Sequence, residues 1–242
     1  MVDSGADPVV ELRDVQKDYR GLRPLRIRHL RLRQGQTLAL VGFDAVTAEV
    51  LVNLITGATV PDAGDVFLFG QSTSALADSD AWLASLDRFG ILSARAVLLD
   101  ELTVEQNLAM PFTLELDPVS DTVRSDVQHL AVEVGLSASD LPRPVAGLAP
   151  LGRLRVRLAR AVALHPRILL AEHPNASVPS NDVSEFAADC RRVVTRRDIA
   201  SLTLTADRAF AAAVAEHVLT LQPATGELKP LSSWWQRLSR LS

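Results

Sequence analysis

Residues 37–57 read Thr37-Leu38-Ala39-Leu40-Val41-Gly42-Phe43-Asp44-Ala45-Val46-Thr47-Ala48-Glu49-Val50-Leu51-Val52-Asn53-Leu54-Ile55-Thr56-Gly57. The apolar run at 37–41 is typical of a buried strand, and Gly42 ends it. We expect a helix from near Thr47 to Ile55, stopped by Gly57. A strand, a glycine, a loop and a helix in this order form the layout of a phosphate-binding loop.

Strands and helices alternate along the rest of the chain. Strands are expected at 9–15, 25–33, 65–70, 168–171, 201–205 and 218–221, the last being the final strand. Helices are expected at 151–164, 181–196 and 208–215, and residues 78–145 read as mostly helical with loops, including a helix over 123–135. This pattern predicts an α/β fold, with a mainly parallel sheet, an antiparallel β portion and a helical subdomain at about 78–150. We place one domain at 1–228 and a Trp- and Arg-containing tail at 229–242.

The composition is globular and excludes several classes of protein. The chain has 242 residues, of which 48% are hydrophobic, and a net charge of −4, which argues against disorder and against a basic nucleic-acid binder. The single cysteine, Cys190, excludes an internal disulfide and a cysteine-based zinc site, and the histidines have no metal-ligand spacing. We find no apolar run of about 18 residues for a membrane span, and the N-terminal residues lack the apolar stretch of a signal peptide.

The phosphate-binding motif itself is poorly matched. Its chemistry needs the pattern G-x-x-x-x-G-K-[ST], in which the lysine contacts phosphates and the hydroxyl residue contacts Mg²⁺. Gly42 supplies the first glycine, but Thr47, Ala48 and Glu49 stand at the second glycine, the lysine and the hydroxyl positions. No lysine lies between Lys17 and Lys229 to take over the missing charge.

The surrounding segments nevertheless resemble the ATPase domain of ATP-binding-cassette (ABC) transporters, over about residues 9–228. The resemblance is strongest to the lipoprotein-release, macrolide-export and cell-division branch, and it implies an ABC-type P-loop NTPase-like fold. The segments that carry it are 11–19, 34–42, 54–57, 61–66, 98–107, 155–161 and 165–171, which read ELRDVQKDY, QGQTLALVG, LITG, PDAGDV, LLDELTVEQN, RVRLARA and HPRILLA.

By this resemblance, most positions that act on ATP in the family have lost their usual residues here. Tyr19 matches the aromatic that stacks on adenine, and Ala94 falls at the glutamine of the loop that couples metal to the permease. Glu172 matches the metal-binding Asp, His173 the catalytic Glu, and Ala206 the switch histidine. The signature loop, normally Leu-Ser-Gly-Gly-Gln, matches Leu148, Ala149, Pro150, Leu151 and Gly152. The resemblance therefore implies no catalytic residue, no metal site, and ATP with Mg²⁺ only if weakly bound, so we expect no cofactor.

Each of these residues also has an ordinary structural interpretation. Glu49 is expected in the first turn of its helix, where an acid satisfies the helix dipole and repels a triphosphate. Tyr19 either stacks a base or packs at a strand end. His173 is either a general base or structural, and Glu172 is a poor Mg²⁺ ligand alone.

Two further groups of residues are assigned structural roles. Cys190 is expected to be buried and inert. The arginines of the 151–164 helix are expected on a solvated or interface face rather than on a nucleic-acid stripe; they are Arg153, Arg155, Arg157 and Arg160.

The sequence therefore predicts a degenerate ABC-type domain that does not hydrolyse ATP and acts as a structural or regulatory subunit of a membrane transporter complex. The alternatives are an active or slow ABC ATPase that energises transport, and a stand-alone scaffold protein. By resemblance, the partners are a membrane permease, an active ABC ATPase or both, as a homo- or heterodimer and without nucleic acid. The expected location is the cytoplasm, peripheral to the inner face of the cell membrane. Residues 98–112 and the tail containing Trp234 and Trp235 are candidate contacts.

Overall fold

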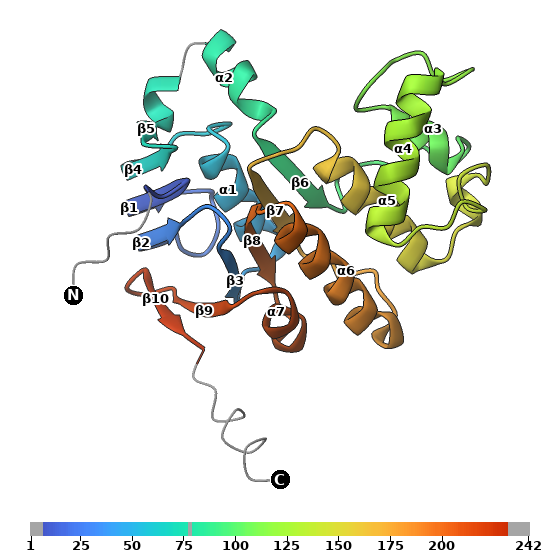
Figure 1. Ribbon diagram of the computed structural model, residues 1–242. Coiled ribbons are helices and arrows are strands. Elements are labelled where there is room, and N and C mark those ends of the chain that lie inside the picture. Colours follow the sequence, from blue (N-terminus) through green and yellow to red (C-terminus); the bar gives the residue numbers. More distant parts are fainter. Residues whose placement is uncertain (1–6, 77–78, 232–242) are drawn as a thin grey trace.

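The computed structural model describes residues 7–76 and 79–231, which form two β-sheets and the helices packed on them (Figure 1). The smaller sheet is antiparallel, with the strand order β2-β1-β4-β5. Its strands are β1 (Val10–Lys17), β2 (Leu25–Leu32), β4 (Ala63–Leu68) and β5 (Gln71–Ser72). In β2 the side chains alternate between buried and exposed except at His29, which follows from one wet face and one face on the core.

A buried carboxylate ties β1 to β2 on the outer face of this sheet. Glu11 is 4% exposed and accepts hydrogen bonds from Arg13 at 2.7 Å and Arg31 at 2.6 Å. The hydrogen bond from Arg13 is the largest influence that lowers its pKa, burial opposes it, and Arg31 and His29 add to it, so that the pKa lies at about 2. Glu11 is therefore ionised at neutral pH and offsets the arginine charge of β2.

The larger sheet has the strand order β10-β9-β3-β8-β7-β6. Its strands are β3 (Thr37–Val41), β6 (Phe89–Ser93), β7 (Ile168–Glu172), β8 (Ala200–Thr205), β9 (His217–Gln222) and β10 (Glu227–Pro230). All neighbours run parallel except β10, which pairs antiparallel with β9. The carboxyl ends of β3, β6, β7 and β8 consequently meet at one edge of the sheet, where open α/β sheets bind ligands.

Seven α-helices are described between and around these strands. They are α1 (Ala45–Ile55), α2 (Ser79–Leu86), α3 (Val104–Ala109), α4 (Asp121–Val134), α5 (Pro150–Val162), α6 (Val183–Arg196) and α7 (Arg208–Val214). Short 3-10 turns lie at Thr73–Leu76, Val145–Gly147 and Ser180–Asp182. No described helix is both long enough and apolar enough to cross a membrane.

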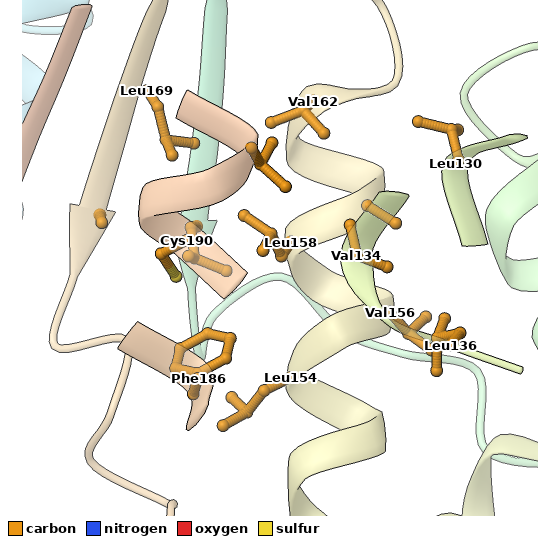
Figure 2. Packing of buried hydrophobic residues seen from close by; sticks show 14 of the residues in the cluster. Leu130, Val134, Leu136, Leu154, Val156, Leu158, Val162, Leu169, Phe186 and Cys190 are labelled. Atoms are coloured by element: carbon orange, nitrogen blue, oxygen red, sulfur yellow. The ribbon is translucent and has the colours of Figure 1, made fainter. Parts of the chain in front are cut away.

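The central strands are buried on both faces, and successive side chains enter two different cores. Leu38 and Leu40 of β3 pack with α1 and the antiparallel sheet, whereas Ala39 and Val41 pack with the helices on the opposite face. Figure 2 shows this second core, which α4, α5 and α6 build against β7 with Leu130, Val134, Leu136, Leu154, Val156, Leu158, Val162, Leu169, Phe186 and Cys190. Because α4 and α5 share this core with the sheet, the helical segment is joined to the rest by apolar packing.

The predicted fold class is confirmed: a mainly parallel sheet, an antiparallel portion and a helical segment are all present. Three details of the prediction were wrong. Residues 89–93 form the edge strand β6 inside the segment that we expected to be mostly helical. The strand at 218–221 is not the last, because β10 follows it and continues past residue 228. Helix α1 begins at Ala45 rather than near Thr47. Tail residues 232–242, including the two tryptophans, lie outside the described residues.

Candidate functional site

A carboxylate from the chain itself occupies the N-terminus of α1. Asp44 is the N-cap residue, and its Oδ1 accepts a hydrogen bond from the backbone N–H of Thr47 at 2.7 Å. The hydrogen bond from the Thr47 backbone is the main reason why the pKa of Asp44 is lowered, and the Thr47 side chain adds to the effect. A helix N-terminus is where a phosphate-binding loop would receive its anion. Here an aspartate already provides the negative charge that the free N–H groups and the helix dipole favour.

Because α1 begins earlier than predicted, the lysine and hydroxyl positions of the phosphate-binding pattern lie further inside the helix. Ala48, at the lysine position, is 0% exposed and packs in the core shared with the antiparallel sheet. Glu49 lies one turn into the helix and not in the first turn, which contains no acidic residue. Our placement of Glu49 in the first turn was therefore wrong, because the helix begins two residues earlier and Asp44 caps it.

Tyr19 covers the same loop. Its hydroxyl lies 3.3 Å from Oγ1 of Thr47, and its half-buried ring packs against the core beneath α1. The backbone at Gly21 also passes close to the ring: a Cβ atom added there would lie 2.4 Å from Cε2 of Tyr19. These contacts agree with the packing alternative for Tyr19.

At the end of β7, Glu172 is held by the strand beside it. Its side chain is 7% exposed, and Oε2 accepts a hydrogen bond from the hydroxyl of Ser93 at 2.9 Å. Arg95 donates from Nε to Oε2 at 3.0 Å and from Nη2 to Oε1 at 2.5 Å. Bidentate contact of this kind satisfies both oxygens of a carboxylate and is among the stronger polar interactions in proteins.

The same guanidinium also reaches α1. Nη1 of Arg95 donates to Oε1 of Glu49 at 2.6 Å, so one cation joins Glu49 and Glu172. By resemblance, these two positions belong in the family to the hydroxyl residue and the carboxylate that contact the metal. Arg95 therefore carries positive charge between the two residues that would face a metal ion.

Sequence reasoning missed Arg95. Ala94, which we matched to the coupling glutamine, is exposed after β6, and its neighbour Arg95 is the residue that reaches the site. Neither lysine contributes, because Lys17 pairs with Asp62 at 2.8 Å and Lys229 pairs with Glu227 at 3.2 Å.

His173, at the position of the catalytic Glu, has an unusual backbone. Its φ is 42°, in the left-handed region that non-glycine residues rarely adopt, and its N–H donates to the carbonyl of Leu204 at 2.8 Å. Nε2 is buried and has no hydrogen-bond partner among the described residues.

Ala206, at the position of the switch histidine, lies beside a network of polar side chains to which it contributes none. Ala206 is exposed, whereas Asp207 caps α7 and accepts a hydrogen bond from Nδ2 of Asn175 at 3.0 Å. Oδ1 of Asn175 in turn accepts from the hydroxyl of Thr205 at 3.1 Å. These hydrogen bonds join the end of β8 to the loop after β7.

The signature-loop segment forms the beginning of α5. Ala149 is its N-cap and provides no side-chain cap, and Pro150 occupies the first turn, where its missing N–H costs nothing. Leu148 and Leu151 are buried in the helical core, and Gly152 lies in the first turn of the helix. The segment therefore serves to start a helix and contributes neither a hydroxyl nor an amide side chain.

These residues do not fit a nucleotide with its metal. Two carboxylates, Glu49 and Glu172, share the guanidinium of Arg95, and Asp44 adds a negative charge at the N-terminus of α1, so the net formal charge of this region repels a triphosphate. The described residues contain no group of three or more His, Cys, Asp or Glu side chains arranged to hold a metal ion. Arg95 already occupies the acids that could serve as ligands.

The two sheets, the helical segment and the strand–loop–helix at the carboxyl edge define an ATP-binding-cassette fold. The family model for the ABC transporter matches residues 25–176. The chain therefore belongs to the ABC transporter family.

Curated relatives and solved structures agree with this assignment. The chain is 31% identical over 206 residues to the lipoprotein-releasing system ATP-binding protein LolD of Xylella fastidiosa strain Temecula1, covering 84% of this chain and 83% of the relative. It is 25% identical over 216 residues to the methionine import ATP-binding protein MetN of Brucella abortus strain 2308, covering 88% of this chain but 57% of that protein. In fold, it resembles the dimeric bacterial ABC transporter cassette MJ0796, with a TM-score of 0.74 at 20% identity over 93% of this chain and 100% of the other. The similarity to cbiO1 of Clostridium perfringens has a TM-score of 0.77 at 16% identity over 93% of this chain and 88% of the other.

Proposed function

We propose that this protein is a degenerate ABC domain that does not hydrolyse ATP and serves as a structural or regulatory subunit of a membrane transporter complex. The observation that carries the proposal is Arg95, bound to both Glu49 and Glu172 at the sheet edge. Phosphoryl transfer depends on positioning and on positive charge beside the phosphates. This chain instead neutralises its own acids and caps its own helix with Asp44.

The proposed setting is the cytoplasmic face of a membrane. Relatives in this family include the ATP-binding protein of a lipoprotein-releasing system, and one solved relative, cbiO1, is described as part of the ABC transporter complex cbiONQ. By analogy, we propose a membrane permease, an active ABC ATPase or both as partners, in a homo- or heterodimer.

Hydrolysis and nucleotide binding provide the first test. We expect no phosphate release above background and no calorimetric signal with ATP and Mg²⁺ for the natural chain. In the double variant Asp44→Ser/Glu49→Gln we expect nucleotide affinity to rise without turnover, because two carboxylates are removed and the helix N-terminus is freed while catalytic groups remain absent. Asp126→Asn, an exposed position on α4, is the matched control for loss of an acid and should behave as the natural chain.

Two outcomes would contradict the absence of hydrolysis or the role as a subunit. Steady-state phosphate release at roughly 1 per second or faster, abolished by His173→Ala, would identify an active ATPase. Purification from membranes of the chain alone, without any membrane protein, would instead favour a stand-alone scaffold.

A further inference from the structure

Two arginines lie over one phenyl ring at the amino-terminal edge of the larger sheet. The guanidinium carbon of Arg167 is 4.4 Å from the centroid of the Phe69 ring, and that of Arg88 is 5.1 Å from the same centroid. Arg88 and Arg167 directly precede β6 and β7. The backbone N–H groups of Arg167 and Ile168 both donate to the carbonyl of Arg88, at 2.9 Å and 3.1 Å, so strand pairing holds the two arginines side by side.

This place is separate from the candidate site described above. Arg167 precedes the amino end of β7, whereas Glu172 lies at its carboxyl end. At about 3.3 Å per residue, this length of strand separates the two residues by roughly 16 Å. A small ligand at one edge of the sheet therefore does not contact the other edge.

The turn that carries Phe69 has an unusual conformation. The φ of Phe69 is 50°, in the left-handed region that a bulky residue rarely adopts. Its N–H donates to the carbonyl of Val9 at 2.9 Å, and its ring packs against the core shared by α1 and the antiparallel sheet, so backbone and ring are both held. A Cβ atom added at Gly70 would meet nothing within 4 Å, so the space beside the turn is open. Rare backbone conformations of this kind gather at ligand sites.

Neither guanidinium has a carboxylate partner among residues 7–76 and 79–231, and both side chains are exposed. The guanidinium of Arg88 has no hydrogen-bond acceptor there, and that of Arg167 donates only from Nη2 to Oε1 of Gln34, at 3.3 Å. Nε2 of Gln34 donates in turn to the carbonyl of Asp198, which fixes the amide. The Asp198 carboxylate faces Gly35, since a Cβ atom added there would lie 2.4 Å from its Oδ1, and it forms no ion pair with either arginine.

Acids of the chain neutralise two arginines of α5. Arg153 pairs with Asp100 at 2.6 Å, and Arg155 pairs with Asp189 at 2.7 Å. Our expectation of one solvated or interface face therefore holds poorly for Arg155, whose side chain is 16% exposed.

A second arginine–phenyl contact gives a closer comparison. Arg13 lies over the ring of Phe67, 4.7 Å from its centroid, and also pairs with Glu11 at 2.7 Å. A ring covers one face of a guanidinium, whereas the N–H groups point outward in its plane. Arg13 therefore uses its edge for an acid of the chain, while the edges of Arg88 and Arg167 remain open to a ligand.

The ligand that fits two such edges is a doubly negative phosphate group. A phosphate monoester carries about 1.5 to 2 negative charges at neutral pH, because its second pKa is about 6. Two guanidiniums balance that charge, whereas a carboxylate would leave one of them uncompensated. The planar fork of arginine also donates to two phosphate oxygens at once. In ATP with Mg²⁺ the metal already neutralises the terminal oxygens, so this place favours a phosphate group without bound metal.

We propose that Arg88 and Arg167 form a binding site for a metal-free phosphate group, with Phe69 supporting both guanidiniums and Gln34 orienting Arg167. The site does not depend on the proposed function, because it lies at the other edge of the sheet and needs neither loss of hydrolysis nor a transporter partner. A free phosphate ester and the headgroup of phosphatidic acid offer the same chemistry, and the experiment separates these two sources.

The experiment titrates methyl phosphate into the full chain at constant ionic strength, with sodium chloride as the blank. The Nε–Hε signals of the arginines are followed by ¹⁵N NMR and assigned from single arginine-to-glutamine variants. We expect saturable shifts of the Arg88 and Arg167 signals. Dimethyl phosphate, which carries a single charge, should bind about tenfold more weakly.

Matched variants test the residues. Arg88→Gln/Arg167→Gln should lower the affinity for methyl phosphate about tenfold or more. Arg191→Gln/Arg196→Gln removes the same charge from two exposed positions of α6 and should leave the affinity unchanged. Phe69→Leu, checked for folding by circular dichroism, should lower it about threefold, because both guanidiniums lose the ring beneath them.

Co-sedimentation with phosphatidylcholine vesicles, with and without phosphatidic acid, identifies the source of the phosphate. Binding that needs phosphatidic acid and is lost in Arg88→Gln/Arg167→Gln would assign the site to a lipid headgroup. Saturable binding of methyl phosphate without vesicle binding would assign it to a free ester. The inference would be overturned if neither probe binds, if the double variant binds as the natural chain does, or if dimethyl phosphate binds equally well; each of these results leaves the proposed function intact.

Discussion

Replacing Arg95 by alanine is expected to lower the free energy of unfolding by about 2–3 kcal/mol. Removing one partner of a buried ion pair costs about 3–5 kcal/mol, because a charge stays buried without compensation. Once Arg95 is lost, the Glu172 carboxylate, whose side chain is 7% exposed, is such a buried charge without a partner cation. Arg95 is itself 46% exposed and Glu49 is 45% exposed, so solvent screens the Arg95–Glu49 ion pair, which adds at most about 1 kcal/mol. Water also partly reaches the Arg95–Glu172 pair, which lowers the expected cost below the buried-pair value.

The assay is urea and thermal unfolding of the single variants Arg95→Ala and Glu172→Gln and of the double variant. For a chain of this size, about 2–3 kcal/mol corresponds to a fall in Tm of roughly 4–12 °C. In the double variant no charge is left unpaired at the end of β7, so the two losses should be less than additive by about 1.5–2 kcal/mol. Additive losses, or an Arg95→Ala variant within about 0.5 kcal/mol of the natural chain, would show that Arg95 does not neutralise Glu172.

Three more measurements test other parts of the structure. Asp44→Ala should cost about 1 kcal/mol in urea unfolding through loss of the helix cap, and Asp44→Asn should recover most of it, since asparagine caps equally well. Glu11→Gln should cost about 1–2 kcal/mol at pH 7, after discounting the full shift for its half-exposed cationic neighbours. Because the folded pKa of Glu11 is depressed, this stabilisation is complete above about pH 4.5 and is lost as the pH falls toward 2, so the variant and the natural chain should converge in acid. Gly90→Ala should lower stability by about 1–3 kcal/mol through the clash with the carbonyl of Ala161, whereas Gly147→Ala, whose added Cβ meets nothing closer than 3.9 Å, should change Tm little.

Periodicity and turn residues were enough to predict most of the fold. The run at 37–41 and the run at 168–171 are continuous apolar segments bounded by turn residues, and both became central parallel strands. Strand β6 was missed because its five residues follow a helix and precede a long loop, where a short apolar run has no period of its own. The start of α1 was predicted too late because Asp44, which caps the helix, stands inside the stretch that the phosphate-binding pattern assigns to a loop.

The sequence indicated where the candidate site lies in the fold but not which side chains meet there. The resemblance to the family pointed to Glu49 and Glu172, which Arg95 joins at the carboxyl edge of the sheet, where parallel strands deliver their ends together. Arg95 could not be found in this way. Its partners lie 46 and 77 residues away in the chain: the pairing of β6 with β7 brings it to Glu172, and the tertiary fold places α1 with Glu49 beside it. A single arginine beside a missing glutamine, two positions after an apolar run, was the only local signal.

The charges of Asp44 and Arg95 belong to the chain, and this changes how the protein responds to its surroundings. A domain that relies on a bound anion and cation gains stability in proportion to the logarithm of their free concentrations, by mass action. Here the anion and the cation are covalently attached, so their effective concentration is set by the fold. If the chain binds no nucleotide, as we propose, its melting temperature should be the same in energy-rich and energy-depleted cells. A domain with that property would keep its fold while the supply of nucleotide falls.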